Sequence, residues 1–293
     1  MAHLTLADGR TLEYLTGGAE DGIPYLYHAG TPSAAVRDDA MWAAAERVGL
    51  RLVTFSRPGY GASTPRPVGD PVPVAADVAD SVELLDALGI DRFVTLGWSG
   101  GGPRALGCAA LLPGRCLAAL SLAGVAPADA DDLDFTAGMG PENVRDFDLA
   151  ARGREALRPV VEEQAAEFGA VTGEQIVAAF GELVDEVDAA ALTGAFADHL
   201  AADFRHAMAQ GAVGLLEDNL QIMRPWGFDV AAITVPVAVW QGAHDKMVPF
   251  AHGQWLAARI PGARVHLFDD EGHLSLISRL DEMLAELRDL SGL

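Results

Sequence analysis

The feature that most constrains the fold is an alternation of short apolar runs with longer helical patterns. Buried strands are predicted at residues 23–29, 50–56, 92–98 and 116–124, and the pattern resumes at 235–243 and 263–270. Helices are predicted between these runs, at 33–48, 77–89 and 250–260 and from about residue 276. This alternation predicts an α/β fold with a mostly parallel sheet and helices on both faces.

Two further runs near the start of the chain complete a predicted eight-stranded sheet. Residues 3–8 and 10–16 alternate apolar and polar side chains, and Asp8-Gly9 lies between them. Alternation around such a dipeptide predicts an antiparallel hairpin.

The middle of the chain breaks the alternation. Residues 127–228 have helical patterns and no convincing strand, and they carry 20 acidic residues against 6 arginines. We expect a helical cap inserted into a core domain made of residues 1–126 and 229–293. The alternative is that these helices belong to the same layer as the others.

Length and charge limit the classes of function. A chain of 293 residues suits one large domain or one domain with an insertion, and its net charge of −22 argues against nucleic acid or an anionic membrane as partner. The start lacks the pattern of a signal peptide, and no run of 18 apolar residues occurs. We therefore expect a cytoplasmic protein that acts on a small molecule, and a homodimer is left open.

The cysteines and potential metal ligands give no sign of a cofactor. Cys108 and Cys116 are expected to be free buried thiols, with a disulfide between them as the alternative. No cluster of Cys, His and carboxylates has metal-ligand spacing. Neither a metal nor an organic cofactor is expected.

A serine flanked by glycines marks the candidate nucleophile. Gly97-Trp98-Ser99-Gly100-Gly101 follows a predicted buried strand and opens a predicted helix. In that position the pattern is typical of a nucleophile elbow, where small neighbours let the serine take strained backbone angles. The alternative is an ordinary serine in a glycine-rich connection.

A serine nucleophile needs a base, and His273 is the best of eight histidines. It follows the last predicted strand, at the end of the sheet where the Ser99 turn must also lie. His266 lies within a strand and is expected to be structural. His199 and His206 belong to the insertion, where they could contact a substrate.

The base in turn needs an acid, and Asp245 lies just after the predicted strand 235–243. Asp129 and Asp131 are alternatives, and the neighbouring Lys246 is expected at the surface. For the developing oxyanion we expect the backbone N–H of Gly100 and that of Thr31, whose hydroxyl could add a third donor.

These motifs together resemble the α/β-hydrolase superfamily, in its capped serine branch of esterases and cofactor-free haloperoxidase-like enzymes. The resemblance covers nearly the whole chain, through "HAGTP" (28–32), "RPGYGAS" (57–63), "GWSGGGP" (97–103), "GAHDKMVP" (242–249) and "EGHLSL" (271–276). Two positions depart from it. Ala29 precedes Gly30 where members often have His, which displaces His28 by one, and Ser56 stands where members often have Asp.

The resemblance and the residues predict hydrolysis of a carboxylic ester, lactone or related acyl bond through an acyl-enzyme on Ser99. The acidic insertion favours a neutral or cationic, largely apolar substrate. Alternatives are C–C bond hydrolysis, acyl transfer or perhydrolysis by the same triad, or a non-catalytic ligand-binding protein. Candidate pocket residues, for each of which packing is the alternative, are Trp98, Met139, Phe180, Met208, Leu220, Met223 and Trp226.

Overall fold

The computed structural model describes residues 1–69 and 71–293 and contains one eight-stranded sheet. Its strand order is β1-β2-β4-β3-β5-β6-β7-β8. The strands are β1 (Ala2–Thr5), β2 (Thr11–Gly18), β3 (Ile23–His28), β4 (Leu50–Phe55), β5 (Phe93–Trp98), β6 (Cys116–Leu122), β7 (Val237–Gly242) and β8 (Arg264–Phe268).

The direction of the strands matches the predicted sheet. β1 pairs antiparallel with β2, and β2 pairs antiparallel with β4. The pairs from β4 through β3, β5, β6 and β7 to β8 are all parallel. Gly9 turns the β1–β2 hairpin at φ 87°, and the Leu6 N–H donates to the Arg10 carbonyl across it at 2.8 Å. The mostly parallel sheet with its N-terminal hairpin is confirmed.

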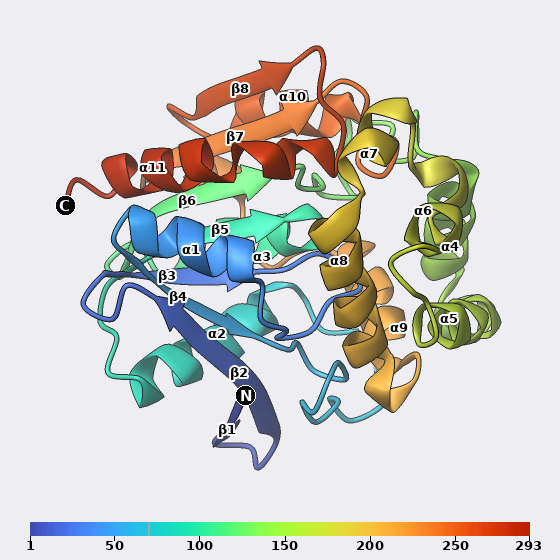
Figure 1. Ribbon diagram of the computed structural model, residues 1–293, viewed down its shortest axis with the longest axis horizontal. Helices are drawn as coiled ribbons and strands as arrows, with labels where there is room; N and C mark the ends of the chain where they lie inside the picture. The colour runs from blue at the N-terminus through green and yellow to red at the C-terminus, as the bar shows by residue number, and fades with distance from the viewer. Residues whose placement is uncertain (70) are drawn as a thin grey trace.

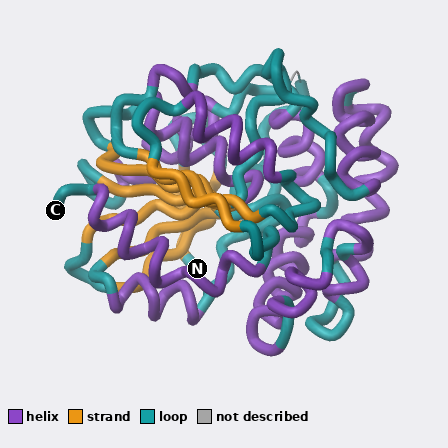
Figure 2. Tube along the Cα trace, turned by 90° about the horizontal axis from the view of Figure 1, so that it is seen from above, coloured by secondary structure: helices purple, strands orange, loops and turns teal. Residues whose placement is uncertain are grey.

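Helices cover both faces of the sheet (Figure 2). On one face α1 (Asp39–Arg47) and α11 (Leu280–Leu290) bury their apolar sides, and on the other α2 (Ala75–Ala87), α3 (Gly102–Leu111) and α10 (Phe250–Arg259) do so. Successive residues of β5 point to opposite faces of the sheet. Phe93 packs on the face covered by α2, α3 and α10, and Val94 packs on the face covered by α1 and α11. The apolar runs of the central strands arise from this two-sided burial.

The helix predicted at 33–48 begins later than expected, at Asp39. Residues before it are held in a loop by hydrogen bonds to side chains from other parts of the chain. Ala34 N–H donates to Asp203 at 2.7 Å, and Ala35 N–H donates to the Ser56 hydroxyl at 2.8 Å. Asp38 then caps the helix by accepting from the Ala40 and Met41 N–H groups. Tertiary partners therefore override the apolar periodicity of this segment.

Residues 127–228, called the insertion below, contain helices and no strand. The helices are α4 (Pro141–Arg152), α5 (Arg154–Phe168), α6 (Ile176–Ala179), α7 (Glu186–Ala191), α8 (Gly194–Ala207) and α9 (Val213–Ile222). They gather beyond the carboxyl ends of the parallel strands, at the right of Figure 1. That edge of the sheet is where ligands of parallel α/β proteins usually bind.

Two further sequence expectations concern the cysteines and membrane-spanning helices. Cys108 and Cys116 are both buried free thiols, as predicted. Over the described ranges, none of the helices is both long and apolar enough to cross a membrane.

Candidate active site

Ser99 lies on a sharp turn between β5 and α3. Its φ is 55°, in the left-handed region that residues with a side chain rarely adopt. The turn closes tightly because its flanking residues are glycines. A Cβ on Gly97 would lie 2.2 Å from the Gly101 carbonyl oxygen, and one on Gly101 would lie 2.0 Å from that of His28. This strained strand-turn-helix geometry is that of a nucleophile elbow.

His273 and Asp245 form a buried pair on two neighbouring loops. His273 Nδ1 lies 2.7 Å from Asp245 Oδ2, and the two residues are 2% and 4% exposed. Asp245 Oδ1 accepts the N–H groups of Met247 (2.9 Å) and Val248 (2.7 Å). Gln241, at the end of β7, donates to Asp245 Oδ2 at 2.8 Å. The carboxylate is therefore held in one orientation, which holds the imidazole in turn.

Two nearby carboxylates favour the protonated form of the His273 imidazole. Burial disfavours charge on His273, but the carboxylates of Asp245 and Asp188 outweigh it, and the pKa of His273 is raised. An imidazole with such partners can accept a proton and stabilise the resulting cation.

Ser99 and His273 line the same cavity. The Trp98 ring stacks on the His273 ring, with centroids 5.8 Å apart, and also contacts Phe196 from the insertion. Trp98 therefore forms one wall of the cavity beside Ser99 and His273.

The loop after β3 reaches Ser99 through Gly30 and Thr31. A Cβ on Gly30 would lie 3.4 Å from Ser99 Cβ, and one on Gly100 would lie 3.6 Å from the Thr31 backbone nitrogen. The Thr31 hydroxyl donates to Asp218 Oδ2 at 2.7 Å. Its proton is therefore committed to that carboxylate, which leaves the backbone amides of Thr31 and Gly100 as the candidate oxyanion donors.

Arg57 fixes the peptide that carries the Thr31 amide. Its guanidinium donates to the carbonyl of Ala29 at 2.7 Å and to that of Gly30 at 2.6 Å. The C=O and N–H of a trans peptide point in opposite directions, so the Thr31 N–H points away from Arg57. A charged donor on the carbonyl also polarises the peptide and strengthens its N–H as a donor.

Buried ion pairs hold Arg57 itself. Asp218, on α9, accepts from Arg57 at 2.6 Å and from Arg104 at 2.9 Å. Arg104, fully buried on α3, also pairs with Asp77 at 2.9 Å and donates to the Gly100 carbonyl. Burial disfavours charge on Asp218, but the two arginines outweigh it and lower its pKa. This network joins the insertion to the loops after β3 and β4 and to α3, which follows Ser99.

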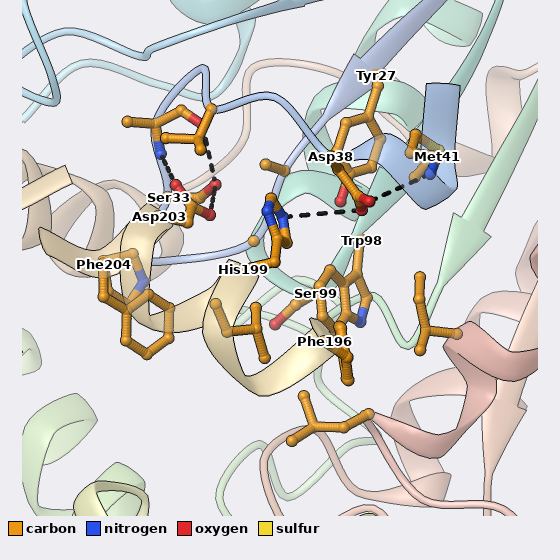
Figure 3. Close-up of a pocket in the computed structure, with 18 of the residues that line it drawn as sticks. Tyr27, Ser33, Asp38, Met41, Trp98, Ser99, Phe196, His199, Asp203 and Phe204 are labelled. Atoms are coloured by element: carbon orange, nitrogen blue, oxygen red, sulfur yellow. Dashed lines mark hydrogen bonds and ion pairs between the residues drawn. The ribbon is translucent and has the colours of Figure 1, made fainter. Parts of the chain in front are cut away.

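The cavity that holds Ser99 and His273 encloses about 850 Å³, counting space open to solvent. Its apolar lining comes from both the sheet domain and the insertion and includes Met41, Trp98, Phe180, Phe196, Leu200, Phe204, Leu274 and Ile277. In Figure 3, Asp38, His199 and Asp203 lie on one side of Ser99 and Phe196 on the other. His199 Nε2 lies 3.7 Å from Asp38 Oδ2. The cavity is thus largely apolar with one polar region.

A second cavity also reaches Ser99 and encloses about 740 Å³ on the same measure. It shares Thr31, Ser99 and Phe180 with the first cavity and extends between α4, α5 and α9. Ser99 therefore lies where two cavities meet.

Of the predicted pocket residues, Trp98 and Phe180 line these cavities. Met208 and Leu220 are packed inside the insertion, and Met223 packs against its core. Met139 is buried with Phe147 against the sheet domain, and Trp226 packs on Phe228. Helical periodicity marks the side chains that are buried but not their neighbours. Five of the predicted pocket residues pack against other helices or the sheet rather than around Ser99, namely Met139, Met208, Leu220, Met223 and Trp226.

Four other histidines have structural partners, line the cavity or lie in the core. His266 Nε2 lies 2.8 Å from Glu286, and His206 Nε2 lies 2.9 Å from Glu13. His199 lines the first cavity, as considered above for a substrate contact. Burial, helped by Arg57 and Arg104, lowers the pKa of His28 to about 3, so its ring is a neutral part of the core.

The structure also places the alternative acids, Lys246 and Ser56, one of the two departures from the resembled family. Asp129 and Asp131 line a separate outer cavity beside Trp226, and Lys246 is exposed. Ser56 donates to Glu13 at 2.6 Å and accepts from Ala35, so it ties the loop after β3 to the hairpin. In the described part of the chain, no three His, Cys, Asp or Glu side chains are grouped to hold a metal ion.

Sequence reasoning missed Arg57, Arg104, Asp188 and Asp218. Arg104 carried a signal, since it is the sole charged residue between Phe93 and Leu112. The two aspartates carried none, because they are 2 of 20 acidic residues in the insertion.

Comparison with known proteins gives a consistent result. The family described as "alpha/beta hydrolase fold" matches residues 28–280. The pimeloyl-[acyl-carrier protein] methyl ester esterase of Aromatoleum aromaticum is 30% identical over 83% of this chain and 88% of its own length. The dihydrolipoyllysine-residue acetyltransferase component of the acetoin cleaving system of Cupriavidus necator is 29% identical over 81% of this chain. The chain spans only 55% of that relative.

A solved structure extends the comparison to the fold. A hydrolase from Pseudomonas aeruginosa superposes with a TM-score of 0.71 over 100% of this chain and 98% of its own, at 23% identity. The two chains therefore share the same overall fold.

Proposed function

Because the chain belongs to the α/β-hydrolase family and is an enzyme of that class, we propose that it cleaves a carboxylic ester, lactone or related acyl bond with Ser99, His273 and Asp245 as its catalytic triad. The observation that carries this proposal is the strained Ser99, with φ 55°, in one cavity with a buried His273–Asp245 pair. A structural serine would have no need of that conformation, nor of an aligned base.

In the proposed reaction Ser99 Oγ attacks the substrate carbonyl carbon while His273 Nε2 takes the serine proton. The amides of Thr31 and Gly100 stabilise the negative oxygen that forms. His273 then protonates the departing alcohol, which leaves an acyl group on Ser99. A water molecule, deprotonated by His273, attacks this acyl-enzyme; the acid departs, and the proton returns to Ser99.

The two cavities support a substrate with a separate group on each side of the reacting carbonyl. Since Ser99 lies where they meet, the acyl part would occupy one cavity and the alcohol part the other. The aromatic lining of the first favours an apolar group. With 20 acidic residues and 6 arginines, the insertion disfavours anionic substrates.

The insertion supports this proposal as a cap over the site. It contributes Phe180, Phe196, Leu200 and Phe204 to the wall opposite the sheet domain. We therefore assign residues 127–228 as a cap and residues 1–126 and 229–293 as the core domain. A cap of this size would exclude folded polypeptides from Ser99.

The test is hydrolysis of p-nitrophenyl esters of increasing acyl length by the wild-type chain, Ser99→Ala and Ser291→Ala. Ser291 lies at the C-terminal end of α11, outside the site. We expect a burst and steady turnover for wild type and Ser291→Ala, and neither for Ser99→Ala. The chain-length preference would measure the cavity that takes the acyl group.

Other outcomes point to the other candidates. Labelling of Ser99 by a fluorophosphonate without ester turnover would favour C–C bond hydrolysis, acyl transfer or perhydrolysis. Absence of both labelling and turnover would contradict a serine hydrolase and favour a ligand-binding protein.

A further inference from the structure

A buried carboxylate of the insertion organises the loop that carries His273. Asp188, on α7, is 0% exposed. Its Oδ2 accepts the backbone N–H of His273 at 2.9 Å. Its Oδ1 accepts those of Leu274 at 2.8 Å and Ser275 at 2.9 Å. Three consecutive N–H groups around one carboxylate form a strong, charge-assisted cradle.

The loop is shaped to admit this carboxylate. A Cβ on Gly272 would lie 2.3 Å from Asp188 Oδ1, so a side chain at position 272 would push Asp188 away. Within the loop, the Gly272 N–H donates to the Ser275 hydroxyl at 2.8 Å, and that hydroxyl donates to Glu271 at 2.7 Å. The backbone therefore wraps closely around Asp188.

The same helix also contacts the loop that carries Asp245. Asp185 caps α7 by accepting from the N–H groups of Val187 and Asp188. Its other oxygen lies 3.1 Å from Nδ1 of His244, next to Asp245 in the sequence. Figure 1 shows α7 beside the loops that follow β7 and β8. One short helix of the insertion thus touches both loops of the proposed acid–base pair.

We propose that Asp188 is a positioning residue for the catalytic base. It fixes the backbone at His273, and its negative charge favours the imidazolium that forms when His273 takes the Ser99 proton. This inference rests on the proposed function. It makes the insertion part of the catalytic machinery as well as a wall of the pocket.

The charges that raise the pKa of His273 are those of Asp245, from the loop after β7, and Asp188, from α7. Asp38, His199 and Asp203 line the same cavity as His273 and stay unchanged in the variants below. Glu271, in the same loop as His273, is paired with Arg279 at 2.8 Å. Removal of the Asp188 charge therefore lowers the pKa of His273, because one of the two anions that favour its charged form is lost.

The experiment compares Asp188→Asn with Glu186→Gln, which removes a charge from an exposed position of the same helix. For Asp188→Asn we expect kcat on a p-nitrophenyl ester to fall about 10- to 100-fold, with KM nearly unchanged, because the base is misplaced. The acid limb of the kcat/KM profile should shift to lower pH. Glu186→Gln should match wild type in both.

The results separate this inference from the proposed function. A folded Asp188→Asn with wild-type kcat and an unshifted acid limb would overturn the positioning role, while an inactive Ser99→Ala would still uphold the triad. Turnover in Ser99→Ala would instead refute the proposed function. A purely structural role of Asp188 would lower the unfolding temperature and leave the acid limb in place.

Asp188→Glu and a wild-type measurement cover the case in which Asp188→Asn does not fold. Asp188→Glu keeps the charge and moves it by one methylene, so we expect a lower kcat with the acid limb unshifted. If neither variant folds, NMR titration of His273 in the wild-type chain and in Gly272→Ala decides. Because a Cβ at position 272 displaces Asp188, we expect a lower His273 pKa in Gly272→Ala, and equal values in the two chains contradict the proposal.

Discussion

Arg57 holds the two carbonyls that precede the proposed Thr31 oxyanion donor. Its contacts with Ala29 and Gly30 require a planar group with several donors, and Asp218 orients that group from the insertion. A lysine would keep the charge but could not reproduce this fork of hydrogen bonds. The geometry of the proposed oxyanion site therefore depends on a side chain that lines neither cavity.

We predict that Arg57→Lys lowers kcat by about tenfold or more with little change in KM, because the Thr31 peptide is no longer fixed. The expected loss is smaller than the 10²- to 10³-fold that follows removal of an oxyanion donor. Steady-state kinetics on a p-nitrophenyl ester would measure it. Arg37→Lys, at an exposed pair with Asp39, is the control. Equal kcat values for Arg57→Lys and wild type would contradict this role.

At the scale of elements, the elbow is built on close contacts between β5, α3 and the loop after β3. Gly101 has an ordinary φ of −75°, so its glycine is required by space alone. We predict that Gly101→Ala lowers the free energy of unfolding by about 1–3 kcal/mol or more, the usual cost of overpacking. Denaturant unfolding would measure the change.

Gly114→Ala is the matched control, since a Cβ there has nothing within 4 Å. We expect it to change stability little. Equal stability of Gly101→Ala and Gly114→Ala would show that the elbow is less tightly packed than described.

A second link between elements joins α8 to the hairpin. Hydrogen bonding to Glu13 outweighs burial and raises the pKa of His206. Burial alone would raise the pKa of Glu13, but His206, Ser56 and the Ala62 N–H outweigh it and lower that pKa. The contribution of His206 to the free energy of unfolding is fully present below the unfolded pKa of histidine, about 6.5. It is lost as pH rises through the raised pKa of His206 in the folded chain. The contribution of Glu13 to the free energy of unfolding is present at higher pH and is lost as pH falls through the lowered pKa of its carboxyl group.

We therefore predict that wild type exceeds His206→Gln in unfolding temperature most clearly near pH 6 and that the difference shrinks toward pH 9. Thermal melts followed by circular dichroism would measure it. His3→Gln, at an exposed position of β1, is the control. A difference that stays constant or grows with pH would contradict the ion pair.

Sequence patterns predicted the elements well where burial is two-sided. The run at 92–98 predicted β5 because both faces of a central strand are apolar, and the glycines around Ser99 predicted the elbow. The patterns failed where long-range partners decide the outcome. Residues 33–38 form a loop because Asp203 and Ser56 bind their backbone. Nothing in a local pattern reveals such partners.

The same limit applies to the site. Ser99, Asp245 and His273 each follow a predicted strand, so topology alone brought them together in the prediction. Asp188 and Asp218 could not be found, because a buried aspartate and a solvated one look alike in sequence. The pocket methionines show the converse, since an apolar helix position does not tell which neighbour it meets.

At the scale of the whole molecule, charge is distributed unevenly. The net charge is −22, and the insertion alone, with 20 acidic residues and 6 arginines, carries most of it. Such self-repulsion opposes the compact state, and salt screens it. We predict that NaCl raised from 10 mM to 300 mM increases the unfolding temperature, by about 2–4 °C for each kcal/mol relieved. Choline chloride should act equally, and an unchanged or lower temperature would contradict this prediction.

The central claim is that Ser99 becomes acylated during turnover. The most direct measurement is intact-mass spectrometry of the chain quenched in acid within the burst on p-nitrophenyl butyrate, followed by peptide mapping. The account predicts a mass increase of one butyryl group, located on Ser99 and absent from Ser99→Ala. Turnover without any acylated intermediate, or acylation at another residue, would contradict it.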